Sequence, residues 1–166
     1  MDVDILGADG ESIGKLPLAE ARAKKLIYRV AGVIVTNSKG EILVHQRSMA
    51  QEHYGGKWAI MACAPVPVGD TYVPTAAKVV REQLRVVPPK GSIILHPIFP
   101  YKLRSADANI DFGIFRCLFD GNLTPNPVDI GTHFFASVSE IEKLMQEKPF
   151  LQSSREILKK YLAFSN

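Results

Sequence analysis

The sequence predicts a domain of the α/β class, more closely α+β, in which helices cover a mixed β-sheet. Three observations support this fold class. The length of 166 residues suits one domain, so residues 1–166 are expected to fold as a single unit. Hydrophobic residues make up 46% and charged residues 22% of the chain, as in ordinary globular proteins. Segments with strand and helix patterns alternate irregularly around a mostly β centre.

Residues 1–26 predict a β-hairpin and a short helix packed on the domain. The hairpin spans residues 3–16 and turns at Asp9-Gly10, a pair that favours tight turns. Residues 17–25 then form the helix, with Pro17 near its first turn, where a missing N–H has little cost. This hairpin could also pair two chains as a homodimer.

The strands expected in the rest of the chain are rich in β-branched or aromatic residues and are bounded by turn residues. The first two form a hairpin, and a polar loop at 48–57 follows them. Pro65 and Pro67 then confine the next segment to a sheet edge or a loop, because proline cannot donate to a strand ladder. The expected strands are residues 27–36, 41–46, 58–63, 93–95, 98–101, 110–119 and 133–137.

The central helix is expected to begin at Thr71, which suits the capping position, and to run to about Arg85. Pro88-Pro89 would prevent its continuation. Its apolar residues follow helical spacing and so predict one buried stripe. The residues of this stripe are Val73, Ala77, Val80 and Leu84.

Two helices are expected at the end of the chain. Each begins at a capping-box pattern, in which a serine precedes a glutamate by three residues. These patterns are Ser139-x-x-Glu142 and Ser153-x-x-Glu156.

Composition excludes several classes of function. The net charge of +3 is too small to indicate a nucleic-acid partner. No apolar run is long enough to cross a membrane, and the N-terminus has no signal-peptide pattern. Cys63 and Cys117 lie far apart in apolar segments, which indicates reduced thiols rather than a disulfide framework. We therefore expect a cytoplasmic protein.

Residues 64–86 and their surroundings carry the most informative pattern. Gln46-Arg47, Gly56-Lys57-Trp58 and Gly69-Asp70 precede the central helix in an order that resembles the Nudix superfamily. The box of that superfamily reads Gly, five residues, Glu, seven residues, Arg-Glu-apolar-x-Glu-Glu-x-Gly-apolar. The N-terminal hairpin and helix are similar to the branch related to isopentenyl-diphosphate isomerase.

This resemblance implies a Nudix fold, with a mixed sheet sandwiched between helices, and a diphosphate-containing ligand. It also implies Mg²⁺ or Mn²⁺, held by the box carboxylates against the diphosphate if the protein is active. The cleft is expected between the helix at 72–86 and the loops at 48–57 and 101–109.

The box departs from the family pattern at most of its charged positions. Asp70 replaces the first glutamate, whereas Val79, Glu82 and Gln83 occupy the three positions of the helix that carry glutamates in active members. We expect these three positions to share the side of the helix that faces away from its apolar stripe. The fixed charges of the family box sum to −3, but residues 64–86 here carry a net +1. Such a surface disfavours a divalent cation and favours a phosphate.

The first hypothesis is therefore a Nudix-fold protein that binds a phosphorylated small molecule, with metal-dependent hydrolysis impaired or lost. Basic and aromatic residues near the expected cleft are its candidate ligand-binding residues. A helix face that is only solvated is the competing interpretation for the central helix. The candidates are Arg47, Lys78, Arg81, Tyr101 and Arg104.

The second hypothesis is a divergent hydrolase of a nucleoside diphosphate derivative. Glu82 and Asp70 would be its catalytic residues and would hold Mg²⁺ or Mn²⁺, with Asp111 as a further carboxylate. Since one helical carboxylate replaces three, this hypothesis ranks below the first.

The third hypothesis is an isomerase that uses Cys63. In isopentenyl-diphosphate isomerase, which this sequence resembles, the catalytic cysteine follows a tryptophan by five residues. Cys63 follows Trp58 by the same number of residues. The Gly-His that follows that cysteine in the isomerase is replaced by Ala64-Pro65. A buried cysteine without a basic neighbour is usually inert, which favours a core thiol.

Overall fold

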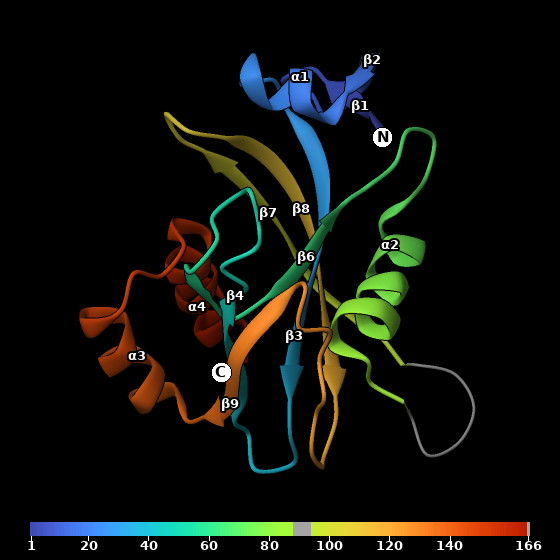
Figure 1. Ribbon diagram of the computed structural model, residues 1–166. Helices are drawn as coiled ribbons and strands as arrows, with labels where there is room; N and C mark the ends of the chain where they lie inside the picture. The colour runs from blue at the N-terminus through green and yellow to red at the C-terminus, as the bar shows by residue number, and fades with distance from the viewer. Residues whose placement is uncertain (88–93, 166) are drawn as a thin grey trace.

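The computed structural model describes residues 1–87 and 94–165, in which a twisted sheet lies between two layers of helices (Figure 1). Over the described residues, seven strands form one mixed sheet. They are β3 (Tyr28–Thr36), β4 (Ile42–Arg47), β5 (Trp58–Ala59), β6 (Ala62–Pro65), β7 (His96–Arg104), β8 (Asn109–Leu118) and β9 (Ile130–Ala136). Both the α+β class and the mixed sheet are as expected.

The strand β3 is the centre of this sheet. It pairs in parallel with β8 from Tyr28 opposite Ile110 to Thr36 opposite Leu118, and it pairs antiparallel with β4 and β6. The order β5-β4-β3-β8-β7 completes the main path, with β9 added to β4. Since β3 is covered on both faces, its nearly continuous apolar sequence is explained by burial rather than alternation.

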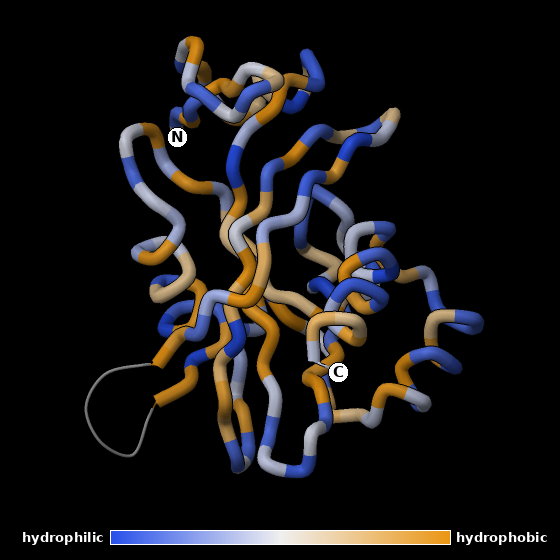
Figure 2. Tube along the Cα trace, turned by 180° about the vertical axis from the view of Figure 1, so that it is seen from behind, coloured by the Kyte–Doolittle hydropathy of each residue, from blue (hydrophilic) through white to orange (hydrophobic). Residues whose placement is uncertain are grey.

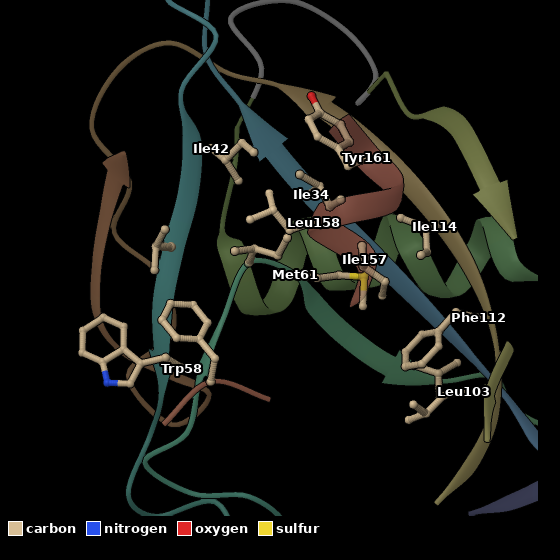
Figure 3. Close-up of a cluster of buried hydrophobic side chains, with 14 of the residues drawn as sticks. Ile34, Ile42, Trp58, Met61, Leu103, Phe112, Ile114, Ile157, Leu158 and Tyr161 are labelled. Carbon is tan, nitrogen blue, oxygen red and sulfur yellow. The ribbon is translucent and has the colours of Figure 1, made fainter. Parts of the chain in front are cut away.

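Each face of the sheet packs against its own helices. The helices α3 (Val138–Glu147) and α4 (Gln152–Ser165) lie on one side, and α2 (Tyr72–Lys78) with its continuation lies on the other (Figure 1). Figure 3 shows Leu158 and Tyr161 of α4 beside Ile34 and Ile42 of the sheet. Hydrophobic residues accordingly follow the central strands, whereas the turns beyond them are hydrophilic (Figure 2).

The N-terminal hairpin consists of β1 (Asp2–Leu6) and β2 (Ser12–Pro17), followed by α1 (Leu18–Ala23). This module sits over one end of the sheet (Figure 1). Asp4 fixes it there, because its carboxylate accepts from Arg29 of β3 at 2.7 Å and from the backbone N–H of Gly69 at 3.0 Å. Leu6 also donates its N–H to the carbonyl of Ile27 at 2.9 Å.

Several expected boundaries are wrong. The expected strand at 58–63 is two short strands, β5 and β6, because the chain bends at Ile60-Met61 between them. The expected strand at 133–137 begins earlier, at Ile130. The segments expected at 93–95 and 98–101 give one strand from His96, while residue 93 and Pro88-Pro89 lie outside the described residues.

The capping box of α3 uses Ser137 and Glu140 rather than Ser139 and Glu142. The Ser137 hydroxyl accepts from the Glu140 N–H, and the Glu140 carboxylate accepts from the Ser137 N–H, each at 3.2 Å. Two overlapping serine-glutamate pairs therefore compete in the sequence, and the earlier one starts the helix. The last helix begins at Gln152, one residue before the expected cap at Ser153. Across the described chain, no helix combines the length and apolarity needed to span a membrane.

Candidate functional site

A cavity of about 460 Å³ lies where β3 and β8 begin and β7 ends. Its volume suits a small-molecule ligand. Three segments line it as expected: the loop at 48–57, the 101–109 segment and the helix that follows α2. The first contributes Gln51, His53, Tyr54 and Lys57, the second Leu103, Ser105, Asp107 and Ala108, and the third Gln83.

The charged lining of this cavity is mainly positive. Arg22, Arg47 and Lys57 line it, against one carboxylate, that of Asp107. Among residues 1–87 and 94–165, none of these four side chains forms an ion pair within 4.0 Å. The apolar part of the lining comes from the sheet and from the segment before α4, and includes Val30, Ile110, Phe112 and Phe150. The cavity therefore combines unpaired cations with an apolar wall.

Arg47 is the central cation of this site. It ends β4, and its Nε and Nη2 donate to the carbonyl of His53 at 3.1 and 2.8 Å. A guanidinium has five N–H groups, so several remain for a ligand. Burial is the main influence on the pKa of Arg47 and lowers it, whereas the nearby Asp129 carboxylate acts in the opposite direction. A partly buried guanidinium of this kind is suited to phosphate recognition.

The loop at 48–57 is held in one conformation by its glycines and by Arg47. A Cβ added at Gly55 would lie 2.5 Å from the carbonyl oxygen of Gln51, so only glycine fits there. Tyr54 adopts a left-handed backbone with φ of 58°, and Gly56 follows with φ of 82°. These constraints hold the rings of His53 and Tyr54, whose centroids are 4.2 Å apart, at the cavity.

Cys63 lies in the cavity wall as an unactivated thiol. Burial raises its pKa to about 12, and the positive charge of Arg47 opposes this effect only in part. Its Sγ donates to the carbonyl of Met61 at 3.8 Å. Since the thiolate is the nucleophilic form, this environment favours an inert cysteine.

The central helix changes its hydrogen-bonding pattern at Val79. The segment η1 (Val79–Leu84) is a π-helix, in which backbone hydrogen bonds join residues five apart instead of four. It ends at Arg85, whose backbone is left-handed with φ of 55°. Glycine adopts this conformation most easily, and glycine is the residue that the family pattern has at this position. This agreement supports the alignment of the box, in which position 85 replaces that glycine.

The expected helix faces are wrong. Val79 is only 1% exposed and packs in the core, whereas Val73 is 55% exposed. Positions 79, 82 and 83 therefore do not share one solvent side, contrary to the expectation. Gln83 faces the cavity and donates from Nε2 to the carbonyl of Cys63 at 2.9 Å. Glu82 is exposed, with its carboxylate 3.9 Å from the ammonium of Lys78.

The other predicted site residues lie outside the cavity lining. Lys78, Arg81 and Asp70 are exposed, and Asp70 closes a turn by donating its N–H to the carbonyl of Pro67 at 3.1 Å. In the described part of the chain, no three His, Cys, Asp or Glu side chains are grouped to hold a metal ion. The donor set at the box positions thus does not fit the Mg²⁺ or Mn²⁺ that the resemblance implies.

Two further candidates are engaged elsewhere. Tyr101 donates its hydroxyl to the carboxylate of Glu156 on α4. Arg104 forms an ion pair with Asp111 at 2.8 Å, so this carboxylate is not free to hold a metal. Of the residues proposed from the sequence, Arg47 and Cys63 line the cavity.

Three charged lining residues were not identified from the sequence. Lys57 stands in the Gly56-Lys57-Trp58 segment, which could have indicated it, because the loop it ends was expected at the cleft. Arg22 and Asp107 carry no local signal, since the first lies in an alanine-rich helix and the second in a polar turn. Only the tertiary fold brings them together.

Comparisons with known proteins place this chain in a family. A model of the NUDIX domain family matches residues 27–161. An uncharacterised Nudix hydrolase of Pseudomonas aeruginosa is 35% identical over 74 residues, which cover 45% of this chain but only 44% of that relative's length. An isopentenyl-diphosphate Delta-isomerase of Pectobacterium atrosepticum is 23% identical over 153 residues, or 89% of this chain and 83% of that protein.

Solved structures agree on the fold. The crystal structure of a Deinococcus radiodurans protein superposes with a TM-score of 0.83 at 15% identity, covering 96% of this chain and 98% of that one. The NUDIX domain of NrtR from Shewanella oneidensis, solved with ADP ribose, gives a TM-score of 0.62 at 12% identity, with 91% and 100% covered. The predicted fold is therefore confirmed, and the chain belongs to the Nudix family.

Proposed function

We propose that the cavity binds a phosphorylated or diphosphate-containing small molecule directly through its cations, and that metal-dependent hydrolysis is impaired or lost. The observation that carries this proposal is the convergence of Arg22, Arg47 and Lys57 on one cavity whose lining has a single carboxylate. The names of two similar proteins support the ligand class, because isopentenyl diphosphate and ADP ribose both contain a diphosphate.

The chemistry of the box positions supports the loss of hydrolysis. A hard divalent cation takes anionic oxygen ligands. Position 79, however, is a buried valine, and position 83 is a glutamine whose side-chain Nε2 donates to the carbonyl of Cys63. Glu82 alone remains, beside the ammonium of Lys78. In place of a metal, the guanidinium of Arg47 can supply positive charge to a phosphate by donating charge-assisted hydrogen bonds to it.

The proposal is tested by titrating the protein with inorganic pyrophosphate in a calorimeter, first with a chelator and then with Mn²⁺. We expect binding in the chelator and little gain from the metal. The variant Lys57→Gln should weaken binding by about 10-fold, the effect of losing one hydrogen bond to a charged group. Lys39→Gln is the matched control, since Lys39 is an exposed lysine in the turn before β4.

Two results would contradict the proposal. One is a protein that binds no pyrophosphate under either condition. The other is tight Mn²⁺ binding accompanied by rapid, Mn²⁺-dependent phosphate release from ADP ribose, which would indicate an active hydrolase.

A further inference from the structure

One cation of the cavity comes from outside the region that matches the Nudix family. The match spans residues 27–161, but Arg22 of α1 lines the cavity. The N-terminal module, residues 1–26, thus contributes to the site as well as covering one end of the sheet (Figure 1).

We infer that Arg22 contacts the anionic group of the ligand, so that the N-terminal module completes the binding site rather than only supporting the fold. This inference rests on the proposed function, because it assigns one further residue to the same cavity. It also assigns a role in ligand recognition to a segment that the family match does not include.

The contacts of Arg22 leave its guanidinium available. Its Nε donates to the hydroxyl of Tyr28, a buried residue at the start of β3, at 3.3 Å. No carboxylate within 4.0 Å neutralises it among residues 1–87 and 94–165. The hydrogen bond holds one edge of the guanidinium, and the two terminal amino groups remain for an anion.

The charge of Arg22 acts on the groups across the cavity. Burial lowers the pKa of His53 most, and the positive charges of Arg22 and Arg47 lower it further. The charge of Arg22 also contributes to the lowered pKa of Arg47, after the larger effect of burial. Arg22, Arg47 and His53 therefore share one electrostatic environment, in which an anion would relieve the repulsion between the two cations.

The position of Arg22 is fixed before any ligand binds. The adjacent Ala21 is fully buried, and the Asn109 amide donates to the carbonyl of Lys25 at 2.7 Å, which fastens the end of α1 to β8. The ion pair between Asp4 and Arg29 fastens the other part of the module to β3. A cation held in this way loses little freedom on binding, which favours a contribution to affinity.

The test compares two single substitutions on the same helical segment by calorimetric titration with inorganic pyrophosphate. Arg22→Gln removes the proposed contact, and Lys24→Gln removes one charge from an exposed side chain that pairs with Glu20 and does not line the cavity. We expect Arg22→Gln to weaken binding by about 10-fold or more, and Lys24→Gln to change it less than about 2-fold. Thermal unfolding of both variants checks the fold.

A second variant separates ligand contact from a purely structural role. Arg22→Lys keeps the charge and should recover part of the lost affinity, whereas a residue that only supports Tyr28 would show a lower unfolding temperature and unchanged affinity. Equal pyrophosphate affinity of Arg22→Gln and Lys24→Gln overturns the inference but leaves the proposed function standing. Failure of the unmodified protein to bind pyrophosphate overturns both.

Discussion

The burial of Val79 predicts that the box cannot be repaired by restoring its first helical glutamate. In Val79→Glu, a carboxyl group would replace an isopropyl group that is 1% exposed and packed among apolar residues. Burial would raise the pKa of the new carboxyl, so that its neutral form predominates at neutral pH. A neutral carboxyl is a poor metal ligand, so we expect no Mn²⁺ site.

The cost in stability follows from the same burial. Losing a fully buried valine costs about 1.5–3 kcal/mol, and burying an unpartnered polar group adds about 1–3 kcal/mol. The sum is about 2.5–6 kcal/mol, a large part of the stability of a typical domain. For a chain of this length, that loss lowers the unfolding temperature by about 5–25 °C.

The assay is thermal unfolding followed by calorimetric titration with Mn²⁺. Val73→Glu is the matched control, because the same substitution on α2 falls on a side chain that is 55% exposed. It should change stability by about 0.5 kcal/mol at most. If Val79→Glu unfolded at the temperature of the unmodified protein, or bound Mn²⁺ tightly, the assignment of position 79 to the core would be refuted.

Three other expectations concern single side chains. Glu82→Gln should leave pyrophosphate affinity unchanged within about 2-fold, since Glu82 is exposed; loss of phosphate release in this variant would favour a hydrolase. Alkylation of Cys63 by iodoacetamide should be slow at neutral pH, because burial raises its pKa to about 12, and rapid labelling would contradict this. Burial lowers the pKa of His45 from its usual 6.5 to about 3. As the pH falls below 6.5, this histidine therefore takes up a proton in the unfolded chain but stays neutral in the folded chain. When the pH is lowered from about 7.5 to about 5, the free energy of unfolding measured in urea should therefore fall by about 2 kcal/mol, and the variant His45→Gln should not show this fall.

The strands and the cleft-forming segments could be predicted from the sequence because their signals are local. Turn residues and β-branched segments marked β3, β4 and β8 to within a few residues. The loop at 48–57 was expected at the cleft because the resemblance to the Nudix superfamily implies it, and the structure places it there. The capping box at Ser137 was missed because a second serine-glutamate pair follows two residues later.

The composition of the site could not be predicted, for two physical reasons. First, the central helix carries apolar residues on more than one face, and the fold buries Val79 rather than Val73, a choice that residue spacing alone does not decide. Second, the cations converge from α1, β4 and the loop after it, and the sequence separation between Arg22 and Lys57 conceals their proximity. Arg47 was identified because it stands inside a recognisable motif.

The parallel pairing of β3 with β8 determines when the cavity can exist during folding. Tyr28 and Ile110 line it from strands that are far apart along the chain, and they become neighbours only when this ladder closes. Contacts between such distant segments form late, because the entropy of closing a long loop opposes them. Ligand affinity should therefore emerge at the last stage of refolding, after the local hairpins have formed.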